Sequence, residues 1–357
     1  MPARRLYFTN RWIDVTAIGG LSIATFVALS LLDTSEVRGS IMSAAFYGMW
    51  LCNWPHFSAT SYRLYSSRAN IAQFPVTALV VPVLLLAGVI WSMAEPAVVA
   101  PYLVKLFLLW SPYHFSGQTY GITLVYARRA GVQFERFEKK AMAAFIFSTF
   151  IYQTARFESA TGLVSYFDIQ YPALGLPPQF VMATEYWMYG TGAALLIALA
   201  RKSLADGRMI HPMVLLPAVT QVFWFVLGAN VALYYEFVPF FHSLQYLLIA
   251  WAMQLSETQQ RLRVSPSRAY AVGESGRWGV INLLGGMVLF WALPRLLANA
   301  SGMPLSTVEG IAIAGVQIHH FFVDGVIWKL RDARVSAPLM ASLADVTGSR
   351  TLAKSPA

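Results

Sequence analysis

The sequence predicts an all-α, polytopic integral membrane protein, a bundle of about ten transmembrane helices with both termini in the cytoplasm. Three observations support this class. Of 357 residues, 57% are hydrophobic and 12% are charged, which is more apolar surface than one water-soluble core of this size can bury. Runs long enough to cross about 30 Å of hydrocarbon recur along nearly the whole chain. Basic residues alternate between rich and poor connections. A soluble multi-domain enzyme and a secreted protein are therefore excluded.

Ten apolar runs are the candidate spans. They comprise residues 12–32, 40–62, 74–94, 100–127, 138–160, 181–200, 210–232, 236–257, 277–298 and 306–328. The first run follows Arg4 and Arg5, as the core of a signal peptide would. It is long, however, and no Ala-x-Ala cleavage site follows it. We interpret it as a retained first helix.

The distribution of Lys and Arg gives an independent test of this count. Twenty-two of the 26 basic residues fall in the two terminal segments and in every second connection. Basic residues are retained on the cytoplasmic side, and an odd number of spans would destroy the alternation. The net charge of +9 therefore indicates membrane topology, and we exclude nucleic-acid binding. The transmembrane domain is predicted over residues 1–331, followed by a polar cytoplasmic tail, 332–357, that we expect to be disordered.

The longest external connection runs from about Ser159 to Phe180. It contains Tyr171-Pro172 and Leu176-Pro177-Pro178. Proline biases the residue before it away from helix, so an ordered cap or interfacial segment is favoured over a helix.

Five of the six histidines lie inside predicted spans. They are His56, His114, His242, His319 and His320, whereas His211 stands at a cytoplasmic helix start. Ionisable side chains are costly in hydrocarbon, so they normally face a bundle interior and act as ligands, relays or counter-ions. All five fall on even-numbered spans, so they run in the same direction and can converge at overlapping depths. We expect a shared metal site; haem ligation and plain structural histidines are the alternatives.

A hydrogen-bonding residue stands four positions after each of four histidines, on the same helix face. The pairs are His56 with Thr60, His114 with Gln118, His242 with Tyr246, and His320 with Asp324. Metal-bound imidazoles generally need an outer partner that fixes the ring. Gln118, Tyr246 and Asp324 are therefore the candidate catalytic residues, and Asp324 could instead be a ligand itself. Pro55, just before His56, is expected to kink its helix toward the site.

The surroundings of these histidines are aromatic. Flanking residues include Trp54, Tyr113, Phe115, Phe240, Phe241, Phe321 and Phe322. An apolar chamber with a few convergent polar groups is typical of a small-molecule site, so a hydrophobic substrate entering from the bilayer is expected. Glu185 is a further intramembrane carboxylate, which either faces a cavity or lies beside an interfacial aromatic belt.

Four short patches resemble a known family. They are Asn53-Trp54-Pro55-His56-Phe57, Pro112-Tyr113-His114-Phe115-Ser116-Gly117, Phe241-His242-Ser243-Leu244-Gln245-Tyr246 and His319-His320-Phe321-Phe322-Val323-Asp324. These patches are similar to those of the bacterial Brp/Blh family of membrane beta-carotene 15,15'-dioxygenases. The resemblance implies a helical protein of a bacterial-type inner membrane that holds non-haem iron on histidines and cleaves a carotenoid. It implies ligand roles for His56, His114, His242 and either His319 or His320.

The preferred function is an integral membrane oxygenase in which His-bound non-haem iron acts on a lipid or isoprenoid substrate. Zinc on the same ligands would give a lipid hydrolase. One alternative is a cytochrome-b-like electron carrier with haem on facing histidines. Another is a transporter that binds a metal ion or proton at His56, Glu185 and Asp324.

Overall fold

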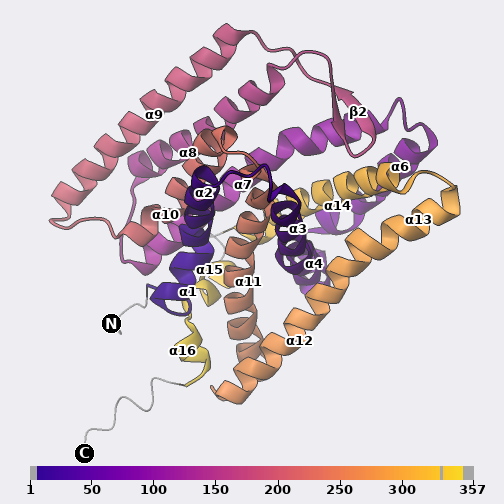
Figure 1. Ribbon diagram of the computed structural model, residues 1–357. Coiled ribbons are helices and arrows are strands. Elements are labelled where there is room, and N and C mark those ends of the chain that lie inside the picture. Colours follow the sequence, from indigo (N-terminus) through magenta and orange to yellow (C-terminus); the bar gives the residue numbers. More distant parts are fainter. Residues whose placement is uncertain (1–5, 330–332, 349–357) are drawn as a thin grey trace, which may run out of the picture.

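The computed structural model describes residues 6–329 and 333–348, and helices make up most of this part of the chain (Figure 1). The α-helices are α1 (Arg11–Val15), α2 (Leu21–Leu31), α3 (Arg38–Gly48), α4 (Trp54–Tyr65), α5 (Arg68–Gln73), α6 (Val81–Ala94), α7 (Ala100–Arg129), α8 (Arg136–Glu158), α9 (Pro178–Ala205), α10 (Pro212–Val222), α11 (Val238–Leu262), α12 (Arg268–Met287), α13 (Leu293–Ser301), α14 (Leu305–Ile327), α15 (Ala333–Ser336) and α16 (Leu343–Val346). Five π-helical segments are η1 (Thr16–Gly20), η2 (Met49–Asn53), η3 (Val76–Val80), η4 (Phe223–Leu227) and η7 (Val288–Ala292). Three 3₁₀ turns are η5 (Gly228–Asn230), η6 (Tyr234–Phe237) and η8 (Pro338–Met340), and the strands are β1 (Leu163–Tyr166) and β2 (Ile169–Pro172).

The predicted all-α class is confirmed. Each of the ten predicted apolar ranges coincides with a helical segment, some of them continued through a π-helical turn. Within the described residues, five segments are long and apolar enough to cross a membrane. They are Arg11–Leu31, Val76–Ala94, Pro212–Asn230, Arg268–Ser301 and Leu305–Ile327.

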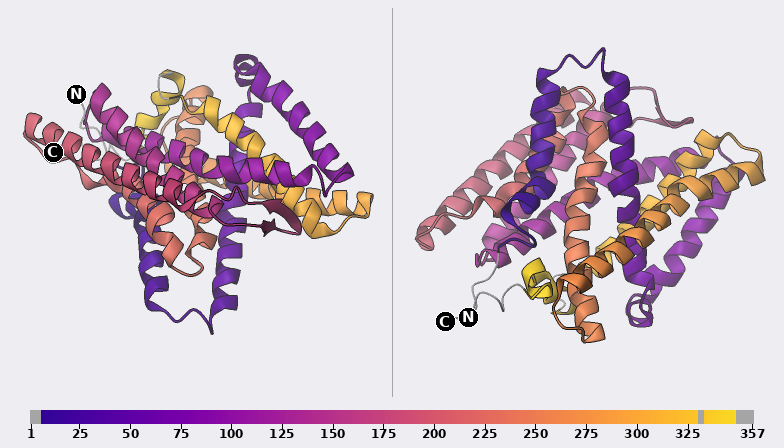
Figure 2. Two further views of the ribbon diagram at one scale, coloured as in Figure 1. Left: turned by 90° about the horizontal axis from the view of Figure 1, so that it is seen from above. Right: turned by 60° about the horizontal axis from the view of Figure 1, so that its bottom comes forward.

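The long helices surround α11. Helices α8 and α9 run alongside each other at one edge of the molecule, and α12 continues into α13 along the opposite edge (Figure 1). Helices α2 and α3, joined by residues 32–37, project beyond the other helices (Figure 2). Helix α14 packs against α4, α6 and α7, so that α4, α7, α11 and α14 meet near the middle.

Proline explains three of the π-helical segments. In η2, η3 and η7, the residue before Pro55, Pro82 or Pro294 donates its N–H to the carbonyl five residues earlier. Proline has no N–H and its ring collides with the carbonyl four residues back, and a wider turn relieves this conflict. The helix distortion expected at Pro55 therefore takes the form of a π turn directly before His56.

The connection before α9 is ordered, as predicted, and it contains a hairpin. Strands β1 and β2 pair antiparallel, with Tyr166 opposite Ile169. Ile169 is buried against α7 and α14, where it packs with Phe107 and Ile311. The hairpin thus caps one end of the helices that carry the site.

The segment after residue 331 differs from the expected disordered tail. Residues 333–348 form α15, η8 and α16, in which Leu339 and Val346 are buried. The fully buried Arg129 of α7 donates hydrogen bonds to the carbonyls of Leu339 and Ala341, at 2.7 and 3.0 Å. The few apolar residues of this Ala- and Ser-rich segment are enough to dock it onto the helices. Residues 332 and 349–357 of that prediction lie outside the described residues.

Candidate metal centre

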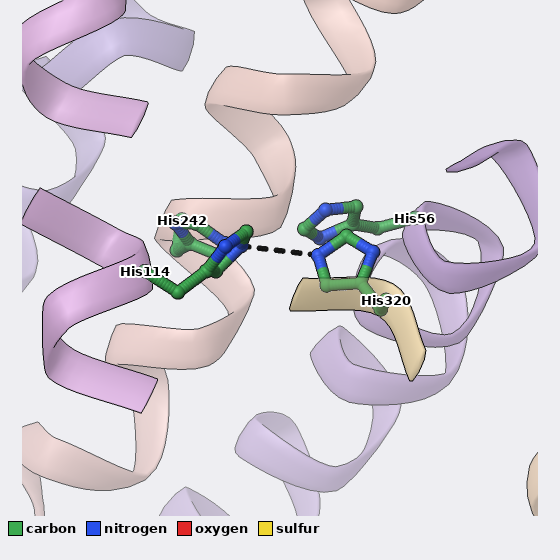
Figure 3. Close-up of side chains that lie close together, drawn as sticks. All are labelled: His56, His114, His242 and His320. Carbon is green, nitrogen blue, oxygen red and sulfur yellow. Dashed lines mark hydrogen bonds between the residues drawn. The ribbon is translucent and has the colours of Figure 1, made fainter. Parts of the chain in front are cut away.

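Four histidines meet at the centre of the protein, each from a different helix (Figure 3). His56 comes from α4, His114 from α7, His242 from α11 and His320 from α14. One ring nitrogen from each lies within 4.8 Å of the corresponding nitrogens of the other three. All four side chains are buried. The structure therefore brings together four of the five histidines predicted to bind a metal.

The four rings form a closed circuit. Neighbouring ring centroids are 4.5 Å apart for His56 and His320, 4.7 Å for His320 and His114, and 5.1 Å for the other two pairs around the circuit, His114–His242 and His242–His56. The Nε2 atoms of His114 and His320 are 3.0 Å apart. Two imidazoles that bind one ion at about 2 Å, roughly at right angles, place their nitrogens at about this separation.

Several ring nitrogens in the centre have no hydrogen-bond partner among the described residues. They are Nε2 of His56, both nitrogens of His242, and Nδ1 of His320. Buried polar atoms are normally satisfied, so this concentration of unpartnered donors and acceptors needs an explanation. A metal ion bound among the four rings would satisfy the nitrogens that face the centre, and imidazole is a good ligand for iron and zinc. The residues present therefore fit a metal ion.

The π turn of η2 and a serine on α11 orient His56. The Ser243 hydroxyl lies 2.9 Å from His56 Nδ1 and accepts a hydrogen bond of the same length from Asn53 Nδ2. Asn53 is the last residue of η2, so the turn before Pro55 places both polar side chains toward α11. This contact fixes the ring and leaves His56 Nε2 facing the other histidines. Sequence reasoning missed Ser243, which carries no spacing signal because its partner is on another helix.

Aromatic rings pack against the imidazoles of the centre. Phe115 stacks on His242 at 3.9 Å between centroids, and Tyr246 stacks on His56 at 4.1 Å. Phe321 packs against His114 at 4.7 Å. Rings packed in this way keep few alternative rotamers, so the nitrogens are preorganised.

Asp324 lies beside the four histidines. Its Oδ2 is 3.5 Å from His320 Nε2 and 3.8 Å from His114 Nε2. Thr60 Oγ1 lies 3.1 Å from Asp324 Oδ1 and 2.7 Å from the Tyr246 hydroxyl. A hydroxyl can donate one hydrogen bond while accepting another, so the three residues form a continuous polar chain. Three of the four residues predicted one turn after a histidine are thus connected to one another.

Gln118, the fourth of these residues, contacts the backbone instead. Its Nε2 donates to the carbonyl of His242 at 2.8 Å and lies 3.4 Å from Gln245 Oε1. Gln118 therefore ties α7 to α11 at the level of the site.

The candidates His319 and Glu185 lie elsewhere, and so does His211, which the sequence sets apart from the predicted site. His319 stacks on Tyr65 and forms a 3.1 Å hydrogen bond with its hydroxyl, apart from the four clustered histidines. His211 caps α10, where its Nδ1 accepts the N–H of Met213. Glu185 accepts a 2.7 Å hydrogen bond from Tyr189 on an exposed face of α9.

Two cavities meet the site from different sides. The larger, of about 850 Å³, is lined by His114, His242 and His320 and by many apolar side chains that include Phe46, Phe115 and Phe321. The smaller, of about 280 Å³, is lined by His114, Asp324 and Tyr246. The predicted apolar chamber beside the histidines is therefore present.

Comparison with family models, curated proteins and solved structures found no match to this chain.

Proposed function

We propose that this chain is an integral membrane metalloenzyme, an oxygenase or dioxygenase with non-haem iron, that acts on a hydrophobic lipid or isoprenoid of the carotenoid type. One observation carries the proposal. Four buried imidazoles from four helices share a centre on the wall of an 850 Å³ cavity. A redox metal beside a large apolar chamber suits oxidation of a substrate that has little polar character. The resemblance of the histidine patches to the Brp/Blh family supports the same reading.

The residues of the chain have distinct roles in this proposal. His56, His114, His242 and His320 hold the ion, and iron supplies dioxygen chemistry when bound. Ser243 fixes the His56 ring. The apolar wall excludes water, and binding of the substrate alongside the ligands orients the reacting carbon.

The chain from Asp324 through Thr60 to Tyr246 provides a path for protons. It connects the carboxylate beside two of the ligands with a phenol that lines the smaller cavity. Asp324 also supplies negative charge, which offsets that of a cation bound by neutral imidazoles.

The proposed topology has ten spans and cytoplasmic termini in a bacterial-type inner membrane. The ten helical segments and the alternation of basic residues support it. In this arrangement the hairpin β1–β2 lies on the external side, and the lipid bilayer delivers the substrate.

Geometry favours a bare ion over haem. A porphyrin supplies four equatorial nitrogens and takes only axial ligands from the protein. Four imidazole rings at mutual spacings of 4.5 to 5.1 Å around the circuit leave no slot for its plane. The transporter alternative is disfavoured because Glu185 does not join His56 and Asp324.

The adjacent residues His319 and His320 provide a test of iron binding. We expect purified protein to contain about one iron per chain by elemental analysis, and His320→Ala to lose it. His319→Ala is the matched control, because it removes the neighbouring imidazole of the same helix and should retain the metal. Equal iron in both variants would contradict the proposal. Zinc in place of iron would point to the hydrolase, and a Soret band would point to haem.

A further inference from the structure

The larger cavity has a polar end away from the histidines. Lys105 of α7 and Glu158 at the end of α8 both line it and form an ion pair. The Lys105 and Glu158 side chains are 12% and 10% exposed, so water screens the pair weakly. The apolar chamber alone gives no reason for a charged pair on its wall.

The bonds of this pair leave capacity for a ligand. Glu158 Oε2 accepts from Lys105 Nζ and, at 3.0 Å, from the N–H of Leu174. Both of these bonds use one carboxylate oxygen, so Oε1 can accept from another donor. An ammonium has three N–H donors. Lys105 therefore keeps donors for an acceptor in the cavity while one points at Glu158.

Three further polar groups lie in residues of the same cavity wall. The Thr154 hydroxyl is buried and has no hydrogen-bond partner among the described residues, whereas the Tyr235 hydroxyl and the Gln153 side chain interact with each other. Gln153 and Thr154 stand one turn before Glu158 on α8. A buried polar atom without a partner is costly, so the Thr154 hydroxyl, one turn before Glu158, indicates that a polar group of a ligand completes this part of the wall.

Helix geometry gives the distance from this polar end to the histidines. Lys105 and His114 both lie on α7, nine residues apart. At 1.5 Å per residue this corresponds to about 14 Å along the helix. Phe107, Leu108 and Ser111 line the cavity between them. A rod-like apolar molecule can therefore reach the histidines with one end while the other end lies at Lys105.

We propose that the cavity binds an isoprenoid alcohol, with its hydroxyl between Lys105 and Glu158 and its chain directed at the four histidines. A hydroxyl matches both partners, because it accepts from the ammonium and donates to the carboxylate. The placement of the reacting carbon at the histidines rests on the proposed function. The binding of the hydroxyl stands on the cavity and its polar end alone.

The test compares two probes that differ only in the hydroxyl. Displacement of tritiated geranylgeraniol from protein in lipid nanodiscs is measured with unlabelled geranylgeraniol and with the matching terpene hydrocarbon. Empty nanodiscs give the lipid background. A hydrogen bond to a charged group contributes about 1.5 kcal/mol or more, so we expect the alcohol to bind at least about tenfold more tightly.

Variants separate binding from a structural role. Lys105→Met keeps the length of the side chain, and we expect it to remove the preference for the alcohol while the hydrocarbon binds as before. Lys202→Met is the matched control, since Lys202 pairs with Asp206 at the end of α9, outside this cavity. Thr154→Val keeps the shape of the side chain but removes the unpartnered hydroxyl of this wall, and should lower the preference severalfold. It tests the same end should Lys105→Met fail to fold.

The outcomes distinguish this inference from the proposed function. The alcohol-binding inference is overturned if the wild type binds both probes with equal affinity. It is also overturned if Lys105→Met loses affinity for both probes equally. Iron content is measured in the same preparations. Absence of iron from all of them would refute the oxygenase and leave the hydroxyl preference standing, whereas iron without any preference would refute only the alcohol.

Discussion

The Nε2 atoms of His114 and His320 lie 3.0 Å apart. The two histidines lie 206 residues apart in the chain and belong to α7 and α14. Two imidazoles that point nitrogens at each other either share one proton or share one ion. Asp324 Oδ2 lies within 3.8 Å of both Nε2 atoms, which favours a positive charge between them.

Replacement of that carboxylate tests the electrostatic argument. Asp324→Asn keeps the shape and a hydrogen-bonding oxygen for Thr60, but it removes the negative charge beside the ion. Loss of such an outer partner typically lowers metal affinity by about 10- to 100-fold. We expect a fall in that range when iron is titrated into metal-free protein.

Glu185→Gln is the control for this variant. It neutralises a carboxylate on α9 that accepts a hydrogen bond from Tyr189, away from the four histidines. Its metal affinity should equal that of the wild type. If both variants bind iron as the wild type does, Asp324 has no role in metal binding.

The hydrogen bond between Ser243 and His56 predicts a second effect. Ser243→Ala leaves the His56 ring without the partner that fixes it and removes an acceptor from Asn53. We expect iron affinity to fall by about tenfold or more, because imidazole ligands depend on such partners. Ser256→Ala, a buried serine of the same helix that accepts from Gln260, is the matched control. A similar loss in both would indicate a general weakening of α11.

Much of the fold follows from the sequence, and so does the membership of the site. The apolar runs predict helix at all ten ranges, and five of the described segments are long and apolar enough to cross a membrane. The rarity of histidine in such runs identifies the cluster. The even-numbered spans also predict that the histidines converge at overlapping depths. The rings of His56 and His242 are indeed neighbours, with 5.1 Å between their centroids.

Other features depend on contacts between helices, which a single sequence does not contain. The two adjacent histidines of α14 point about 100° apart, and the contact of His319 with Tyr65 shows which of them lies away from the cluster. Likewise, the composition of residues 332–357 resembles a disordered tail. Within it, Leu339 and Ala341 are nevertheless held by the Arg129 guanidinium, which lies about 200 residues earlier in the chain.

Arg129 makes a testable contribution to stability. It donates to the carbonyls of Leu6 and Tyr7 at one terminal segment and to those of Leu339 and Ala341 at the other. Arg129→Met leaves four carbonyls without this donor. We expect a destabilisation of about 3 to 5 kcal/mol, seen as a lower unfolding temperature in detergent.

Arg208→Met provides the comparison for Arg129. Its exposed guanidinium donates one described hydrogen bond, to the carbonyl of Gly131, and exposed bonds of this kind contribute little. The unfolding temperature of this variant should stay near that of the wild type. Equal destabilisation by the two substitutions would show that Arg129 does not hold the two terminal segments.

Replacing each of two glycines of α12 by alanine distinguishes the effect of close packing from the effect of helix propensity. Only one of the two glycines contacts the helix that carries His56. A Cβ on Gly286 would lie 2.6 Å from the carbonyl carbon of Trp54 and 2.9 Å from the nitrogen of Pro55, directly before His56. Backbone atoms cannot yield as side-chain ends do, so Gly286→Ala must push α12 away from α4. We expect a cost of about 1 to 3 kcal/mol and a loss of bound iron as His56 moves.

Gly279→Ala carries the same chemical change two turns earlier on the same helix, where a Cβ meets nothing within 4 Å. Alanine favours helix over glycine by up to about 1 kcal/mol, so this variant should be as stable as the wild type or slightly more stable. Thermal unfolding and iron analysis of both variants check the prediction. If Gly286→Ala retains wild-type stability and iron, the close approach of α12 to α4 does not position His56.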